Sequence, residues 1–191
     1  MNEYSGFSQH IAKATIELAK TGDKSAMEAI YVQYANPCFS LANRITTNPQ
    51  MSEDIVHSVF VKVMKNISTF EHSGAFSGWI RRIAVNESIA ILQSHNKFDS
   101  TIEFEDEQII SEYLQEANTQ FDTAWWEAQN DLQKLSQRLS ARARTILFLH
   151  EIEGYSHKEI AELFGKTESF SKQSLARSMR LLQTLTNIKG A

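Results

Sequence analysis

The sequence predicts an all-α fold, with two small helical domains joined by an acidic linker. Only 2 of the 191 residues are proline, 7 are glycine and 42% are apolar, so long helices and a real core can both form. Apolar residues recur every three or four positions through most of the chain, as in amphipathic helices. Residues 101–130 hold 8 Asp and Glu but no Lys or Arg, and they lack strong periodicity. We therefore expect one domain at 1–97, a flexible linker at 98–124 and a second domain at 125–191.

The first domain is predicted to hold helices at residues 7–20, 24–35, 37–46, 52–67 and 77–95. Apolar side chains at helical spacing define the first of these, namely Ile11, Thr15 and Leu18. Asp23 can cap the second helix and Ser52 the fourth, because both side chains accept hydrogen bonds from free backbone N–H groups. Asn36 and Pro37 favour either a new helix start or a mild kink.

The fourth predicted helix has the widest apolar stripe, made of Ile55, Val56, Val59, Phe60, Val63, Met64 and Ile67. The loop at 68–76 then carries Phe70 and Phe76. Exposed aromatic rings in a loop can stack on nucleic-acid bases, but such rings also tuck under the loop. On the next helix, Arg82 and Asn86 are predicted to face outward, as a nucleic-acid contact surface would.

The last third of the chain has the turn chemistry of a helix-turn-helix. Ser140 can cap one helix, and Gly154 fits the left-handed position that ends it. Ser156 and Glu159 have the spacing of a capping box, which starts a short helix. Gly165 then allows a tight turn. Residues 131–191 are also the basic part of the chain, with 10 Lys and Arg against 6 Asp and Glu, whereas the whole chain has a net charge of −4.

The second helix of this motif begins near Thr167, a plausible cap, and reaches about residue 182. Its predicted core positions are Phe170, Leu175, Met179 and Leu182, and its predicted exposed positions are Lys172, Gln173, Arg177 and Arg180. In a helix-turn-helix of this kind, the second helix enters the major groove of DNA. An ordinary αα-hairpin without DNA contact would show similar spacing.

Four segments resemble bacterial sigma factors of the extracytoplasmic-function (ECF) group. Residues 52–63 and 76–86 resemble two helices of region 2, the second reading Phe-Ser-Gly-Trp-Ile-Arg-Arg-Ile-Ala-Val-Asn. Residues 139–144 and 153–161 resemble region 4. The resemblance implies a dissociable subunit of core RNA polymerase that directs promoter-specific initiation. Region 2 would dock on the clamp helices of the largest subunit and open the −10 element. Region 4 would dock on the flap of the second-largest subunit and read the −35 element.

The resemblance also implies roles for individual positions. Docking on the clamp is assigned to Asp54, His57 and Ser58. Capture of a flipped −10 base falls on Phe70, His72, Ser73 and Phe76, with Arg82 and Asn86 on the helix beside them. Base reading at the −35 element falls on Ser169, Lys172, Gln173 and Arg177. Phosphate contacts are assigned to Lys158 and Arg180. The acidic segment would lie in a basic channel that RNA later occupies, and an anti-sigma factor would hold the chain inactive.

At the clamp-docking positions, His57 and Ser58 stand where the family often has glutamine and glutamate. In region 4, three more positions depart from the usual pattern. Ser140 stands where proline is common, and serine can also begin a helix. Ser171 stands at a position where valine is common, so an apolar contact is lost, which Phe170 can replace. Ser174 stands where arginine is common, which removes a charge. These departures predict an unusual −35 preference.

Two other readings compete with the sigma-factor hypothesis. A free-standing helix-turn-helix regulator that binds operators as a dimer would explain residues 131–191 but not the first hundred. An interaction protein that has lost DNA contact is suggested by Ser171 and Ser174.

An enzyme needs a catalytic site, and the sequence offers no good one. The best metal-like cluster is His150, Glu151, Glu153 and His157. Gly154 interrupts the helix between them, so these side chains are expected to diverge. We therefore predict no catalytic residues, no metal and no cofactor.

Cellular location is predicted from what the chain contains. Cys38 is the single cysteine, which fits a reducing cytoplasm, and it is expected to be a small buried apolar residue. No run of apolar residues is long enough for a membrane span, so no direct membrane insertion is expected.

Overall fold

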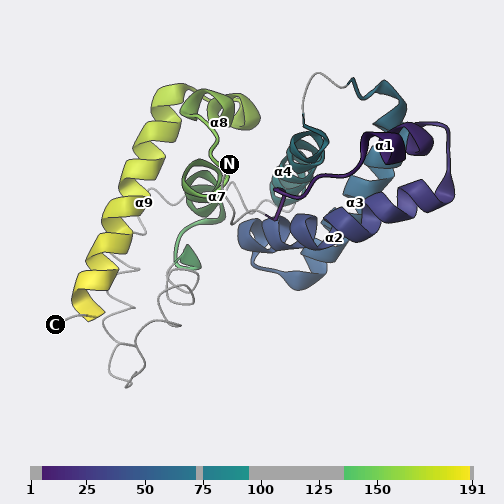
Figure 1. The fold of residues 1–191 in the computed structure, drawn as a ribbon. Coiled ribbons are helices and arrows are strands. Elements are labelled where there is room, and N and C mark those ends of the chain that lie inside the picture. Colours follow the sequence, from purple (N-terminus) through teal and green to yellow (C-terminus); the bar gives the residue numbers. More distant parts are fainter. Residues whose placement is uncertain (1–5, 72–74, 95–135, 190–191) are drawn as a thin grey trace. The chain divides into compact units, whose positions relative to one another are not determined.

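Figure 1 shows the computed structural model, which describes residues 6–71, 75–94 and 136–189. These residues form helices and connecting turns without a strand among them, so the predicted all-α class is confirmed. The chain divides into two compact units, residues 1–95 and 96–191, and each is described by itself. The predicted linker at 98–124 lies outside the described residues.

The N-terminal part of the first unit begins with a folded loop and a short helix. Helix α1 spans Lys13–Lys20, so the predicted start at residue 7 is wrong. Ala12 is extended and ends the loop, in which the buried Phe7 ring stacks on Tyr34 with centroids 6.3 Å apart. The helix buries Ile16 and Ala19, whereas Leu18 is 54% exposed. The loop returns Phe7 to the core. The long-range contact of Phe7 with Tyr34 outweighs the local helical spacing that predicted an earlier start of α1.

Helix α2 spans Lys24–Thr46 and is continuous through Pro37, so no new helix starts there. Asp23 caps it as predicted, accepting a hydrogen bond from the Ala26 N–H at 2.7 Å. Inside the helix, Cys38 is fully buried, and burial raises the pKa of its thiol to about 12. The thiol therefore stays protonated and acts as the predicted small apolar residue.

Helix α3 spans Pro49–Asn66, so it begins four residues earlier than a cap at Ser52 would allow. The cap is Asn48, whose side chain accepts from the Met51 N–H at 3.1 Å, and Pro49 takes the first helical position. Ser52 is buried, and its hydroxyl donates to the Asn48 carbonyl at 2.7 Å. The predicted capping role of Ser52 is therefore wrong. Its hydroxyl instead braces the corner between α2 and α3, because it also lies 3.1 Å from the Thr46 hydroxyl.

A 3-10 turn at Ile67–Thr69 leads toward helix α4, which spans Phe76–Ser94. Helices α2, α3 and α4 pack against one another around a core of fully buried side chains: Ile30, Tyr34, Leu41, Ile45, Ile55, Val59, Ile80 and Leu92. Each such aliphatic side chain contributes about 1.5–3 kcal/mol relative to an exposed position. The predicted stripe of α3 is confirmed except at its edge, where Met64 is 53% exposed.

The second unit contains helices α7, spanning Ala141–Glu151, α8, spanning His157–Phe164, and α9, spanning Glu168–Lys189. Ser140 caps α7 as predicted, accepting from the Ala143 N–H at 3.2 Å. Helix α9 packs on both α7 and α8 over a core of Ile146, Leu147, Leu149, Ile160, Leu175, Leu181 and Leu182. The predicted burial of Met179 is wrong, since this side chain is 40% exposed and Ser178 takes the buried position beside it.

Candidate nucleic-acid interface

Two turns shape the helix-turn-helix of the second unit. Gly154 has a φ of 73° and ends the turn after α7. Ser156 and Glu159 form the predicted capping box: the Glu159 N–H donates to the Ser156 hydroxyl at 3.2 Å, and the Ser156 N–H donates to the Glu159 carboxylate at 2.9 Å. Gly165 has a φ of 61° and ends α8. These left-handed positions favour glycine because a Cβ would strain the backbone there.

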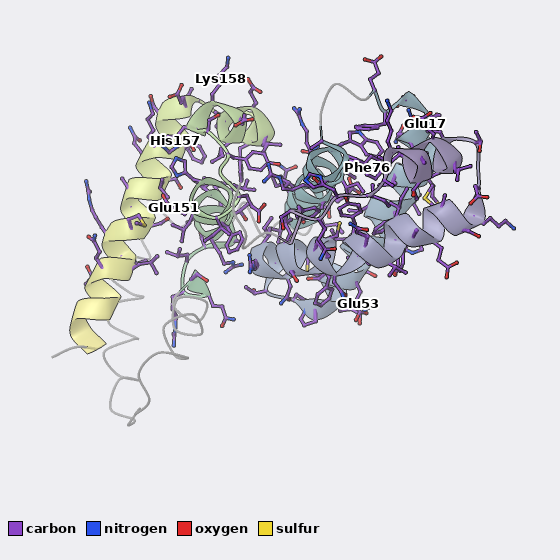
Figure 2. All side chains as sticks on the ribbon, in the orientation of Figure 1. Glu17, Glu53, Phe76, Glu151, His157 and Lys158 are labelled. Carbon is purple, nitrogen blue, oxygen red and sulfur yellow. The ribbon has the colours of Figure 1, made fainter. Side chains whose placement is uncertain are left out.

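Thr167 begins the recognition helix α9 in the predicted way, because its hydroxyl accepts from the Phe170 N–H at 3.2 Å. The side chains predicted to meet DNA all lie exposed on this helix: Ser169, Lys172, Gln173, Arg177 and Arg180. Steps of three and four residues separate them, so they share one stripe of the helix. On α8, Lys158 is exposed as well, and Figure 2 shows it directed away from the helices.

Lys172 already has a partner within its own helix. Its Nζ lies 2.7 Å from a carboxylate oxygen of Glu168, one turn earlier. The hydrogen bond and charge of Lys172 hold the pKa of the Glu168 carboxyl below its usual range. Both side chains are more than half exposed, so the pair is weak and a DNA phosphate can displace it.

His157 connects the three helices of this unit. Its Nδ1 lies 3.0 Å from the hydroxyl of Ser171 on α9, and its ring stacks on His150 of α7 with centroids 4.3 Å apart. Figure 2 shows His157 beside α9 and Glu151 at the end of α7. The pKa of His157 is lowered, first by burial and then by the charges of His150 and Lys172.

The two histidines do not diverge, so the expectation for this part of the metal-like cluster is wrong. Their rings stack face to face, however, and His150 Nδ1 is directed to Glu151 at 3.0 Å. Among the described residues, no group of three or more His, Cys, Asp or Glu side chains is placed to hold a metal ion. The same part of the chain contains no helix with the length and apolarity that a membrane span requires.

In the first unit, the aromatic residues of the 68–76 loop are buried. Phe70 and Phe76 meet edge to face at 5.1 Å, and both contact the Trp79 ring, at 5.3 and 5.4 Å. Figure 2 places Phe76 within this unit. The other two loop candidates, His72 and Ser73, lie outside the described residues. The two rings therefore pack with Trp79 inside the unit, and neither Phe70 nor Phe76 exposes a face for stacking.

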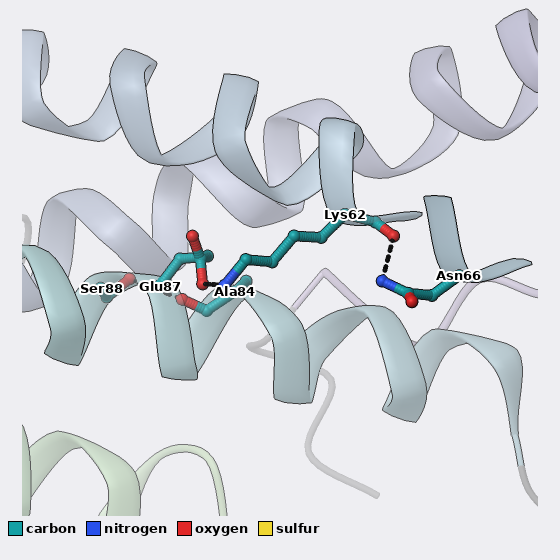
Figure 3. Close-up of polar contacts among 5 residues, drawn as sticks. All are labelled: Lys62, Asn66, Ala84, Glu87 and Ser88. Atoms are coloured by element: carbon teal, nitrogen blue, oxygen red, sulfur yellow. Dashed lines mark hydrogen bonds and ion pairs between the residues drawn. The ribbon is translucent and has the colours of Figure 1, made fainter. Parts of the chain in front are cut away.

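Helix α4 carries its two candidates on the outside. Arg82 and Asn86 are exposed and lie one turn apart. The next residue, Glu87, points inward and is only 8% exposed. Figure 3 shows its carboxylate paired with the Lys62 ammonium group, which reaches across from α3. The Lys62 carbonyl accepts from the Asn66 amide at 2.9 Å, and Ser88 donates to the Ala84 carbonyl at 2.7 Å, so both helices are braced near the pair.

Helix α3 carries the three docking candidates. Asp54 and His57 are exposed and Ser58 is half-buried. His57 and Ser58 follow Asp54 by three and four residues, so all three lie on one side of the helix. His57 also borders a surface groove between α2 and α3, together with the apolar side chains of Met27, Tyr31, Phe39, Phe60 and Met64.

Several of these contacts had no signal in the sequence. The His157–Ser171 bond joins residues 14 positions apart, and the Lys62–Glu87 pair joins residues 25 apart. A glutamate among apolar neighbours on α4 was the one available hint of a buried ion pair. Nothing in the spacing of His150 and His157 predicts a stack across the glycine turn.

Comparisons with known proteins cover most of the chain and agree on one family. The family model described as "Sigma-70 region 2" matches residues 30–98, and "Sigma-70, region 4" matches residues 129–182. The chain is 23% identical to the ECF RNA polymerase sigma-E factor of Haemophilus influenzae, over 90% of this chain and 93% of that one. It is 26% identical to the ECF RNA polymerase sigma factor SigW of Bacillus subtilis, over 90% and 94%.

Two solved structures share the fold. The sigma factor RpoE of Bartonella quintana, solved with the anti-sigma factor NepR, matches with a TM-score of 0.54 at 18% identity, over 84% of this chain and 96% of that one. CnrH, solved with the cytosolic domain of CnrY, matches with a TM-score of 0.53 at 16% identity, over 91% and 96%. The two family regions occur in order, and each falls on one structural unit with the helices described above. The chain therefore belongs to the sigma-70 family, as a sigma factor of the extracytoplasmic-function group.

Proposed function

We propose that the chain binds core RNA polymerase and directs it to promoters by recognising a −35 and a −10 element. Sigma factors are transcription initiation factors and not enzymes, so the catalysis belongs to the polymerase. The observation that carries the proposal is the pairing of the two family regions, in order, with an exposed basic stripe on α9. Such a chain works where the polymerase and the promoter are, which is the cytoplasm of a bacterium.

Reading of the −35 element is assigned to α9. Lys172 and Arg177 offer donors to guanine edges, and Gln173 offers the amide geometry that suits adenine. Ser169 lies at the start of the helix, where hydroxyl groups contact bases or phosphates. Lys158 on α8 and Arg180 at the far end of the stripe would bind phosphates, which fix register without reading sequence. The exposure of all six side chains supports this assignment.

Opening of the −10 element is assigned to the loop before α4 and to Arg82 and Asn86. The burial of Phe70 and Phe76 gives these rings a supporting part, because their cluster with Trp79 anchors both ends of the loop. His72 and Ser73 are then the loop positions proposed to contact an extruded base. Extrusion costs a few kcal/mol, so a loop held at both ends suits the task better than a loose one.

Docking on the polymerase is assigned to α3, through Asp54, His57 and Ser58 for the clamp helices, and to the second unit for the flap. The domain boundaries remain a proposal: region 2 at 1–97, the linker at 98–124 and region 4 at 125–191. The division of the structure into units at residue 95 supports the first boundary.

An anti-sigma factor is the proposed regulator. Of the two solved structures described above, one contains a sigma factor with the anti-sigma factor NepR, and the other contains CnrH with the cytosolic domain of CnrY. The apolar groove between α2 and α3 and the exposed Met179 are surfaces that such a partner can cover.

Transcription in vitro tests the proposal. Core polymerase supplemented with the purified chain should initiate at defined sites on genomic DNA, and core alone should not. Start-site mapping then gives the promoter elements. Equal initiation with and without the chain would refute the proposal. A gel shift separates the sigma factor from a free-standing regulator, which would bind its operator at physiological salt without core polymerase.

A further inference from the structure

The first turn of the recognition helix α9 is held by a hydrogen bond to a buried serine. Ser171 lies in its first turn, directly before Lys172 and Gln173, and its side chain is fully buried. A small side chain fills little volume, so packing alone defines the orientation of the helix weakly at this point. The Ser171 hydroxyl instead makes a hydrogen bond with His157 Nδ1, at 3.0 Å.

His157 is itself fixed on its other side. It is the first residue of α8 and lies inside the capping box, between Ser156 and Glu159. Its ring stacks on His150 of α7 with an interplanar angle of 21°. One imidazole therefore touches α7 by its face and α9 by its edge, while its backbone belongs to α8. A side chain in this place can couple the orientation of α9 to the positions of α7 and α8.

We propose that His157 is a positioning residue for −35 recognition: it sets the rotation of α9 about its axis, and so determines which base edges Lys172 and Gln173 reach. This inference rests on the proposed function, in which α9 reads the −35 element. A rotation of about 20° moves a side chain at the helix surface by about 2 Å. Such a shift is enough to break a hydrogen bond to a base.

The electrostatic surroundings keep this histidine uncharged. His150 and Glu151 face it from α7, and Glu168 and Lys172 face it from α9. Burial, followed by His150 and Lys172, lowers the pKa of His157 by more than the two carboxylates raise it. Near neutral pH the imidazole is therefore neutral and can exchange a hydrogen bond with the Ser171 hydroxyl in either direction. A neutral ring also has little attraction for phosphate, which favours positioning over direct DNA contact.

The test uses holoenzyme reconstituted from core polymerase and the full chain, on promoter DNA with a randomised −35 element. The readout is the ratio of transcripts from preferred and disfavoured −35 sequences. His157→Ala and Ser171→Ala should each reduce this ratio about fivefold, the worth of one hydrogen bond. The double variant should lose little more than either single variant, because both remove the same bond.

Matched variants separate positioning from folding and from direct contact. Asparagine can place an amide near the position of Nδ1, so His157→Asn should retain most of the preference, whereas His157→Gln should not. Ser178→Ala is the control for Ser171→Ala, because Ser178 is equally buried on α9 but donates to the Ser174 carbonyl of its own helix at 2.9 Å. This control should leave the −35 preference unchanged.

Three results would overturn the inference. The variants could lower transcription from every sequence equally and leave the preference intact, which would indicate a structural role only. The salt dependence of binding could weaken by about one ion per variant, which would indicate a phosphate contact. The effects of His157→Ala and Ser171→Ala could also add. If wild-type chain gives no start-site selectivity, the proposed function fails instead, so the two failures are distinguishable.

Discussion

Replacing Lys62 by methionine tests whether the ion pair between α3 and α4 stabilises the first unit. The variant leaves the Glu87 carboxylate without its ammonium partner at a position that is only 8% exposed. Removing one partner of a fully buried pair costs about 3–5 kcal/mol, and an exposed pair contributes about 0.2–1 kcal/mol. The Lys62 side chain is 53% exposed, so solvent screens the pair in part and we expect about 1–2 kcal/mol.

Hydrogen exchange in the full-length chain measures this loss where it occurs. Two units need not unfold together, so a single melting temperature would mix their responses. A loss of about 1.4 kcal/mol makes the slowest amides of α3 and α4 exchange about tenfold faster, while amides of α7–α9 keep their rates. Lys65→Met, which removes an exposed lysine from the same helix, is the matched control.

A double variant identifies the cause of the loss. Lys62→Met combined with Glu87→Leu should recover most of the stability, because the uncompensated buried charge is gone. The reasoning is refuted if Lys62→Met costs no more than Lys65→Met. It is also refuted if the double variant is as unstable as Lys62→Met alone, since apolar replacement would then not relieve the burial.

Three further predictions concern the second unit. Ile160→Ala should destabilise it by about 2–5 kcal/mol, seen as faster exchange of α8 and α9 amides, because this side chain is fully buried; an unchanged exchange rate would contradict the assigned core. The pKa of folded His157 lies below its ordinary 6.5, so as pH falls below 6.5 the unfolded chain takes up a proton first and stability is lost. Exchange of α8 and α9 amides, corrected for the intrinsic pH dependence of exchange, should show this loss as pH falls below about 6.5, and His157→Asn should lessen it. Lys172→Ala should weaken transcription chiefly from promoters with the preferred −35 sequence, and an equal loss on every promoter would reassign Lys172 to phosphate contact.

The helix-turn-helix could be predicted because its determinants are local. Gly154, Gly165 and the Ser156–Glu159 capping box each act within a few residues, so the sequence pattern specifies the backbone directly. The start of α3 was less predictable, since Asn48 and Ser52 are both good caps. Proline after Asn48 decides between them, because it fits the first helical position and has no N–H to satisfy.

The contacts that position the candidate site could not be predicted in the same way. Burial of Phe70 and Phe76 depends on Trp79, which lies one turn further along α4, and on Tyr34, which comes from α2. The bond from His157 to Ser171 depends on how three helices meet, and helical periodicity carries no information on this. Ser171 was interpreted as the loss of an apolar contact, whereas the structure shows a buried hydroxyl with a specific partner.

The ion pair between Glu168 and Lys172 bears on how the chain distributes among the many sites of a chromosome. A DNA duplex that binds Lys172 must first break the ion pair of Lys172 with Glu168. The Glu168 carboxylate then lies close to the DNA phosphates. A site with a guanine within reach of Lys172 compensates for the lost ion pair, whereas a random sequence does not. We expect Glu168 to weaken nonspecific binding to chromosomal DNA, so that more of the protein stays available to the polymerase.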